Sequence, residues 1–195
     1  EITTGFRMCA GGIHLKYGIN PDIAVFAKSM ANGYAMAAII GVERVMQAAQ
    51  TTFISSTNWT ERIGPAAAIA TIQKYIEENV ADHIIEIGNA LQKAWQEKSD
   101  KYQFDVHVSG IPTLGHFAFN GDNNREMMTF FTIEMLKHGF LGFHQFKPSF
   151  AHTMQDVEAY AKAVDDIFDK IRHTDSNKLL QTPPAHAGFH RLTKE

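Results

Sequence analysis

The sequence predicts an α/β fold in its first half and a smaller α+β domain after it. Short, uninterrupted apolar runs at residues 23–27 and 35–41 are typical of strands that are covered on both faces of a sheet. Longer stretches with apolar residues at three- and four-residue spacings indicate helices. With 195 residues, of which 45% are hydrophobic and 20% charged, the chain has enough material for one large or two small domains.

The composition excludes several classes of function. A formal net charge of -3, with basic and acidic residues interspersed, gives no basic stripe for nucleic acid or anionic membranes. The single cysteine, Cys9, excludes an internal disulfide and fits a reducing compartment, so we expect a cytoplasmic protein. No apolar run approaches the roughly 18 residues of a membrane span. The five histidines between residues 107 and 152 lack metal-ligand spacing, so no metal site is expected.

The first half contains one residue of chemical interest, Lys28, at the end of the strand predicted for residues 23–27. A short helix is expected at residues 43–49, after the second strand. From Pro65 to about Glu97 the sequence is strongly helical, because Pro65 suits a first turn and an Ala-rich run follows it. A bend is expected near Glu78-Asn79.

The pattern of the second half predicts a small α+β domain. Residues 104–108 and 113–119 alternate as two antiparallel strands that a turn at Gly110 joins. Residues 125–138 predict a helix that Gly139 ends.

The clearest helix spans residues 153–172. Thr153 and Asp156 have the spacing of a capping box at its start. Seven apolar residues then form one stripe, namely Val157, Tyr160, Ala161, Val164, Ile167, Phe168 and Ile171.

These elements divide the chain into three parts. Residues 1–97 form one domain with its connecting helix, and residues 98–173 form the small α+β domain. The tail at residues 174–195 has little periodicity, so it is expected to run over the surface or to be partly disordered.

Lys28 has two interpretations. A lysine at the end of a strand commonly does no more than mark the edge of a sheet. However, apolar surroundings at the end of a buried strand disfavour the ammonium form and leave a nucleophilic amine for a carbonyl group. The turn at residues 29–33, with Asn32 and Gly33, would allow the backbone to approach a bulky ring.

Four motifs surround Lys28. They are Thr4-Gly5-Phe6-Arg7, Gly11-Gly12, Tyr17-Gly18-Ile19-Asn20-Pro21-Asp22 and Phe26-Ala27-Lys28-Ser29-Met30-Ala31-Asn32-Gly33. In order, residue types and gaps they resemble the signature of the class III aminotransferases, which use pyridoxal phosphate (PLP), and the resemblance is closest to the glutamate-1-semialdehyde aminomutase branch.

The resemblance implies the fold type I PLP-transferase architecture. Residues 1–97 would then be the C-terminal part of its mainly parallel large domain, followed by the small C-terminal domain. Lys28 would hold PLP through a Schiff base and would serve as the catalytic base. The resemblance also implies a homodimer with shared active sites, in which Thr60 reaches the phosphate of the neighbouring subunit's cofactor. Ser56 and Thr57 would add hydroxyl groups to the phosphate site or, alternatively, cap the following helix.

Three functions remain open at this point. The first is a transaminase that moves an amino group between an amino donor and a keto or aldehyde metabolite, and the second is an aminomutase. The third is a catalytically incompetent fragment, because the aspartate that the resemblance places on the pyridine nitrogen would stand immediately before Glu1. We therefore expect that these 195 residues alone bind PLP weakly or not at all.

Overall fold

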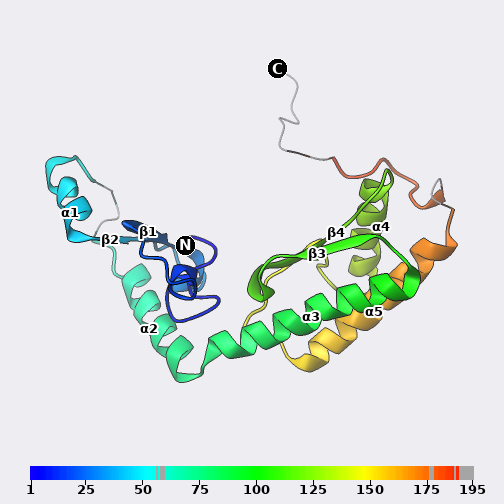
Figure 1. Ribbon diagram of the computed structural model, residues 1–195, viewed down its shortest axis with the longest axis horizontal. Coiled ribbons are helices and arrows are strands. Elements are labelled where there is room, and N and C mark those ends of the chain that lie inside the picture. Colours follow the sequence, from blue (N-terminus) through cyan, green and yellow to red (C-terminus); the bar gives the residue numbers. More distant parts are fainter. Residues whose placement is uncertain (56, 58–59, 176–177, 187, 189–195) are drawn as a thin grey trace, which may run out of the picture. The chain divides into compact units, whose positions relative to one another are not determined.

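The computed structural model describes residues 1–55, 57, 60–175, 178–186 and 188 (Figure 1). The chain divides into two compact units, Glu1–Glu86 and Ile87–Glu195. No helix among the described residues combines the length and the apolar character that crossing a membrane would require.

The first unit is built around one antiparallel strand pair. Strand β1 (Ile23–Phe26) pairs with β2 (Ala38–Gly41), so that Ile23 faces Gly41 and Phe26 faces Ala38. Short helical segments and one long helix surround the pair; they are η1 (Ile13–Leu15), η2 (Lys28–Met30), α1 (Glu43–Met46), η3 (Gln47–Thr51) and α2 (Ile63–Glu77). The predicted strands are confirmed, although β2 begins three residues later than the apolar run.

The apolar core of the first unit is small. Its buried members are Ala24, Phe26, Met30, Ala31 and Ala68. The expectation that both strands are covered on both faces is wrong for β2, because Ile39 and Ile40 are 61% and 54% exposed. These side chains therefore stay largely open, whereas alternate residues of β1 are buried.

Helices α2 and α3 (Val80–Tyr102) are separated where the bend was predicted (Figure 1). Asn79 lies between them with a φ of 49°, a left-handed conformation that an α-helix cannot contain. The side chain of Asn79 donates a hydrogen bond of 2.7 Å to Asp82 in the first turn of α3.

The second unit contains a three-stranded antiparallel sheet and helices. The strand order is β3 (Val106–Ser109), β4 (Gly115–Phe119) and β5 (Gln145–Phe146). The other elements are the 3₁₀ turn η4 (Pro112–Leu114), helix α4 (Asn124–Lys137) and helix α5 (Met154–His173). The capping box at Thr153 is confirmed, since the backbone N–H of Asp156 donates to the Thr153 hydroxyl and that of Thr153 donates to Asp156.

Large aromatic side chains fill the core of the second unit. Trp95, Phe117, Phe131 and Phe168 are each fully buried. Trp95 comes from α3, and its indole N–H donates a hydrogen bond of 3.2 Å to the Tyr160 hydroxyl on α5. This bond satisfies the buried polar atom of the largest core residue.

Part of the C-terminal tail packs on this unit. Leu179 is buried in the aromatic core, and the Arg125 guanidinium donates to the Ala185 carbonyl at 2.8 Å. The Ala185 N–H in turn donates to the Thr129 hydroxyl. The expectation of a tail that only runs over the surface is therefore wrong for Leu179, because one isolated apolar contact leaves no periodic signal in a sequence.

Candidate active site

Lys28 stands two residues beyond β1, where the chain turns sharply. Phe26, the last residue of β1, is buried against the ring of Phe6, with ring centroids 5.6 Å apart. Lys28 has a φ of 49°, a left-handed conformation that costs a residue with a side chain about 1–2 kcal/mol. Its Nζ donates a hydrogen bond of 2.8 Å to the Thr3 hydroxyl.

The expectation that Lys28 is desolvated is wrong for the residues that the structure describes, because its side chain is exposed. The strand before Lys28 is partly buried, but the turn carries the lysine away from the core. The amine is therefore positioned by Thr3 and accessible to a ligand.

A pocket of about 380 Å³ opens beside Lys28. This volume lies within the range of small-molecule sites, which is roughly 300–1,000 Å³. Gly33 has a φ of 102°, and a side chain added there would meet no atom within 4 Å, so the turn leaves open space on this side. The lining residues are Arg7, Lys28, Ser29, Asn32, Gly33 and Tyr34.

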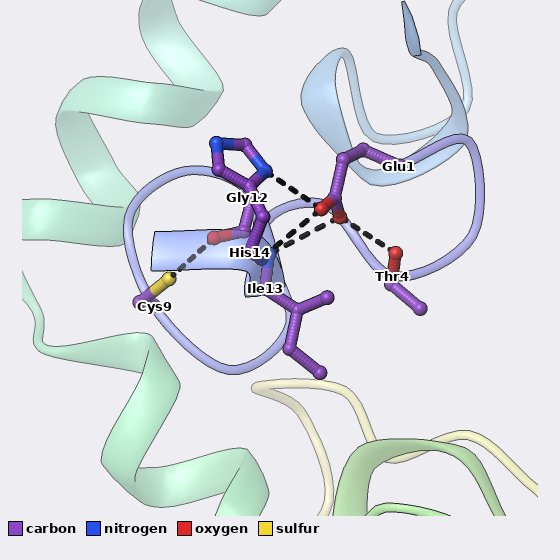
Figure 2. Close-up of polar contacts among 6 residues, drawn as sticks. All are labelled: Glu1, Thr4, Cys9, Gly12, Ile13 and His14. Atoms are coloured by element: carbon purple, nitrogen blue, oxygen red, sulfur yellow. Dashed lines mark hydrogen bonds and ion pairs between the residues drawn. The ribbon is translucent and has the colours of Figure 1, made fainter. Parts of the chain in front are cut away.

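The Glu1 carboxylate fixes the loop that carries Thr3 and Arg7. Figure 2 shows four hydrogen bonds converging on it, from the Thr4 hydroxyl at 2.6 Å, the Ile13 N–H at 3.1 Å, and the His14 N–H at 3.2 Å and ring Nδ1 at 2.8 Å. Burial would raise the pKa of Glu1, but the hydrogen bonds from Thr4 and His14 outweigh it and lower the pKa to about 2. This carboxylate is therefore ionised at neutral pH and holds the two ends of the loop together.

Cys9 lies on the same loop and has a structural role. Its Sγ donates to the Gly12 carbonyl at 3.2 Å (Figure 2), and burial raises the pKa of the thiol. A protonated thiol is a poor nucleophile.

The structure does not join the predicted phosphate-binding hydroxyls to Lys28. Thr57 and Thr60 are exposed in the segment between η3 and α2, and the described lining of the Lys28 pocket includes neither. Ser56 lies outside the described residues. The start of α2 is capped by Glu61, whose carboxylate accepts hydrogen bonds from the backbone N–H groups of Ile63 at 2.6 Å and Gly64 at 3.2 Å.

Arg7 and Tyr34 belong to the pocket although sequence reasoning assigned them no function. The Arg7 Nε donates a hydrogen bond of 2.8 Å to the Thr3 carbonyl. Arg7 was part of the motif Thr4-Gly5-Phe6-Arg7, so the motif marked its position but not its role. Among the described residues, no group of three or more His, Cys, Asp or Glu side chains is arranged to hold a metal ion.

Comparison with known proteins identifies the family. Residues 1–174 match the family described as Aminotransferase class-III. The chain belongs to the class-III aminotransferases. The Lys28 turn therefore lies inside the part of the chain that the class-III family matches.

Curated class-III relatives have related but differing activities. The chain is 28% identical to a 3-aminobutyryl-CoA aminotransferase of Cloacimonas acidaminovorans, over 88% of this chain and 43% of the relative. It is 26% identical to an aminopentol aminotransferase of Sphingopyxis macrogoltabida, over 88% of this chain and 41% of the relative. A glutamate-1-semialdehyde 2,1-aminomutase of Lachnoclostridium phytofermentans is 29% identical, over 81% of this chain and 41% of the relative. The chain thus spans less than half the length of these relatives.

Solved structures show the same fold. The FumI protein of Sphingopyxis sp. MTA144, in its PLP internal aldimine form, matches with a TM-score of 0.82 and 26% identity, over 87% of this chain and 42% of that chain. An acetylornithine aminotransferase from Elizabethkingia anophelis has a TM-score of 0.76 and 16% identity, over 87% of this chain and 46% of that chain. This chain therefore has the α/β fold of part of a type I PLP transferase.

Proposed function

We propose that the protein containing this chain is a PLP-dependent transaminase in which Lys28 is the catalytic residue. It would transfer an amino group between an amino donor and a keto or aldehyde metabolite. The observation that carries the proposal is the exposed Lys28 amine, fixed by Thr3 at the edge of a small-molecule pocket within a class-III match.

The groups in the pocket suit PLP. A primary amine condenses with the cofactor aldehyde, while the Ser29 hydroxyl and the Asn32 amide offer hydrogen-bond donors to its polar atoms. The residues that line the pocket include no carboxylate, so none of them repels a phosphorylated ligand. When bound, PLP supplies an electron sink that stabilises negative charge on the substrate carbon.

Lys28 would perform two tasks in this reaction. Its Nζ would hold the cofactor, and the same amine, when not bonded to the cofactor, would accept the proton from the substrate carbon. Thr3 serves both tasks because its hydroxyl already accepts a hydrogen bond from Nζ and so restricts the rotamers of the lysine.

Further parts of the proposal concern the assembly. Thr60, with Ser56 and Thr57, would bind the cofactor phosphate of the partner subunit in a homodimer. This would account for the exposed hydroxyls of Thr57 and Thr60 outside the Lys28 pocket. We propose domain limits at residues 1–97 and 98–173 with a tail at 174–195. These limits count helix α3 with the first domain as its connecting helix, although Leu91 and Trp95 of α3 pack in the core of the second unit. We also propose a cytoplasmic location, which the single cysteine supports.

An aminomutase is the second candidate because of the 29% identity to a glutamate-1-semialdehyde 2,1-aminomutase. The two functions differ in what leaves the site. A transaminase releases a keto product when it is given an amino donor alone, whereas an aminomutase returns an isomer of its substrate.

The Lys28→Ala variant tests the function. We expect PLP and borohydride to leave a reduced adduct on the peptide containing residue 28 in the unmodified protein and none there in the variant, as measured by mass spectrometry. Amino-donor turnover should fall by at least about 10²–10⁴-fold. The control is Lys16→Ala, which removes an exposed lysine of the same unit and should change neither measurement.

Turnover that persists in Lys28→Ala would refute the transaminase proposal. The incompetent-fragment alternative has a separate test, in which PLP is titrated into the 195-residue chain and followed by absorbance. Weak binding is expected there, and tight binding with turnover would exclude that alternative.

A further inference from the structure

Two cationic side chains are held on one threonine at the edge of the pocket. The Lys28 Nζ donates to the Thr3 hydroxyl and the Arg7 Nε donates to the Thr3 carbonyl, each at 2.8 Å. Both side chains line the same pocket, whose other members are uncharged. Because both cations are bonded to the same residue, a ligand small enough for this pocket can reach both of them.

The hydrogen bond to Thr3 fixes the Arg7 side chain but engages only one of its N–H donors. A guanidinium has five N–H donors, and Nε supplies one of them. Within the described part of the chain, no hydrogen-bond acceptor is recorded for the two terminal nitrogens of Arg7. These nitrogens form the planar fork that binds carboxylates and phosphates through two parallel hydrogen bonds.

The surroundings of Arg7 favour an anionic ligand. The side chain is half-buried, and this burial lowers the pKa of its guanidinium, which is the direction that desolvation of a cation produces. The neighbouring Tyr75 cannot compensate the charge, since burial raises the pKa of its hydroxyl to about 12 and keeps it neutral. A desolvated cation without an anionic partner is costly, and an oxyanion from solution would remove that cost.

We propose that Arg7 is a specificity-determining residue that binds the carboxylate of the substrate while Lys28 acts on its amine-bearing carbon. The proposal rests on the proposed function and narrows it to substrates with an acid group a few bonds from the reacting carbon. The phosphate of the cofactor has the same oxyanion chemistry, so the experiments are designed to separate these two sources.

The first experiment detects the anion without any turnover. The ¹⁵N–¹H signal of the Arg7 Nε is assigned by its loss in Arg7→Lys and followed while acetate is added at constant ionic strength. We expect a saturable shift with acetate and none with chloride. Arg44 is the internal control, because it lies on the same unit and already pairs with Asp22. Equal, non-saturating shifts of both arginines would overturn the proposal.

The second experiment compares two amino donors that differ by one carboxylate, 4-aminobutyrate and butylamine. In the PLP-loaded protein, Arg7→Gln should lower kcat/KM for 4-aminobutyrate about 10- to 100-fold, the effect of losing hydrogen bonds to a charged group. For butylamine the change should stay within about threefold, and Arg7→Lys should restore part of the loss. The control Arg44→Gln should affect neither donor.

Other outcomes are equally decisive. If Arg7→Gln lowers both donors equally and weakens PLP binding in equilibrium dialysis, Arg7 binds the cofactor phosphate and the proposal is wrong. If neither donor is affected while circular dichroism is unchanged, Arg7 binds no anion that matters for the reaction. A failure of the proposed function is recognised separately, since Lys28→Ala would then retain turnover while the acetate shift persisted.

Discussion

The two units of this chain differ in how they are stabilised. The described core of the first unit has five buried residues, of which three are alanines, whereas the corresponding core of the second has fifteen, including six aromatic residues. The first unit also exposes large apolar side chains on β2 and nearby loops, with Phe53 at 96%. The candidate active site nevertheless lies in the first unit.

The unit with the larger apolar core is therefore not the unit that carries the candidate active site. In the first unit, hydrogen bonds to Glu1 and Thr3 hold the loops around Lys28, and few apolar contacts support them. In the second unit, aromatic packing fixes the elements and no candidate site residue is present. Local opening should therefore be easier in the unit that carries the site.

The largest expected effect is on the core of the second unit. Phe131→Ala removes a fully buried ring that contacts Phe117 and Phe168, and should lower the free energy of unfolding by about 3–5 kcal/mol. Phe26→Ala in the first unit should cost less, because fewer large side chains surround the cavity. Urea unfolding with hydrogen exchange, resolved by peptide, measures both. An equal cost for the two variants would contradict the comparison.

The accuracy of the sequence-based prediction differed between elements of the fold. Helix α5 was predicted nearly to the residue, because Thr153, Asp156 and the apolar stripe are local signals that agree with one another. Strand β5 was missed, since Gln145 and Phe146 are too few to show a period. Sequence patterns report periodicity over neighbouring residues, so short elements that depend on a partner strand escape them.

The site was predicted only in part for a related reason. Lys28 was found because it follows an apolar strand and matches a family motif, but its exposure depends on what covers it in space. The Glu1 contact to His14 joins residues thirteen positions apart in a loop, which no periodicity encodes. Arg7 was part of a sequence motif, but only the structure shows that it bonds to Thr3 and lines the same pocket as Lys28.

An intermediate effect on stability is expected when a hydrogen-bonded carboxylate is removed, namely Glu134 in the second unit or Glu1 in the first. Glu134 in α4 is 4% exposed and bonds to Lys137 and, at 2.7 Å, to Lys170 of α5. Burial would raise the pKa of Glu134, but the hydrogen bonds and charges of the two lysines outweigh it and lower the pKa below the ordinary value of a glutamate. Glu134→Gln should cost about 1–3 kcal/mol at pH 7. Glu97→Gln, in the exposed Lys93 pair, is the control and should cost less than about 0.5 kcal/mol.

The pH dependence of stability can be followed separately in the two units, through Glu1 in the first and Glu134 in the second. Both carboxylates have lower pKa values in the folded chain than when unfolded, so their contribution to stability is complete above about pH 4.5 and is lost as the pH falls through the folded pKa. For Glu1 this loss extends down to about pH 2. The protection of residues 1–14 from hydrogen exchange, taken relative to the intrinsic exchange rate at each pH, should therefore fall between pH 4.5 and 2 in the unmodified chain, and Glu1→Gln should lower it already at pH 7. If Glu1→Gln leaves the hydrogen exchange of residues 1–14 unchanged, the Glu1 carboxylate does not stabilise this loop.

The smallest expected effect is at the helix caps. Thr153→Ala removes the hydroxyl that accepts from the Asp156 N–H and should cost about 0.5–2 kcal/mol, while Thr153→Ser keeps an acceptor and should cost less. Glu61→Ala removes the acceptor at the start of α2 and should cost about 0.3–1 kcal/mol, since an exposed carboxylate there acts mainly on the helix dipole. Hydrogen exchange of the first turns of α5 and α2 measures the two losses separately. Fraying confined to the first turn is expected for α5, because its aromatic core holds the rest of the helix. For α2, whose face buries little more than Gly64, Ala68 and Tyr75, exchange should rise along more of the helix, so that the smaller energetic loss produces the wider opening.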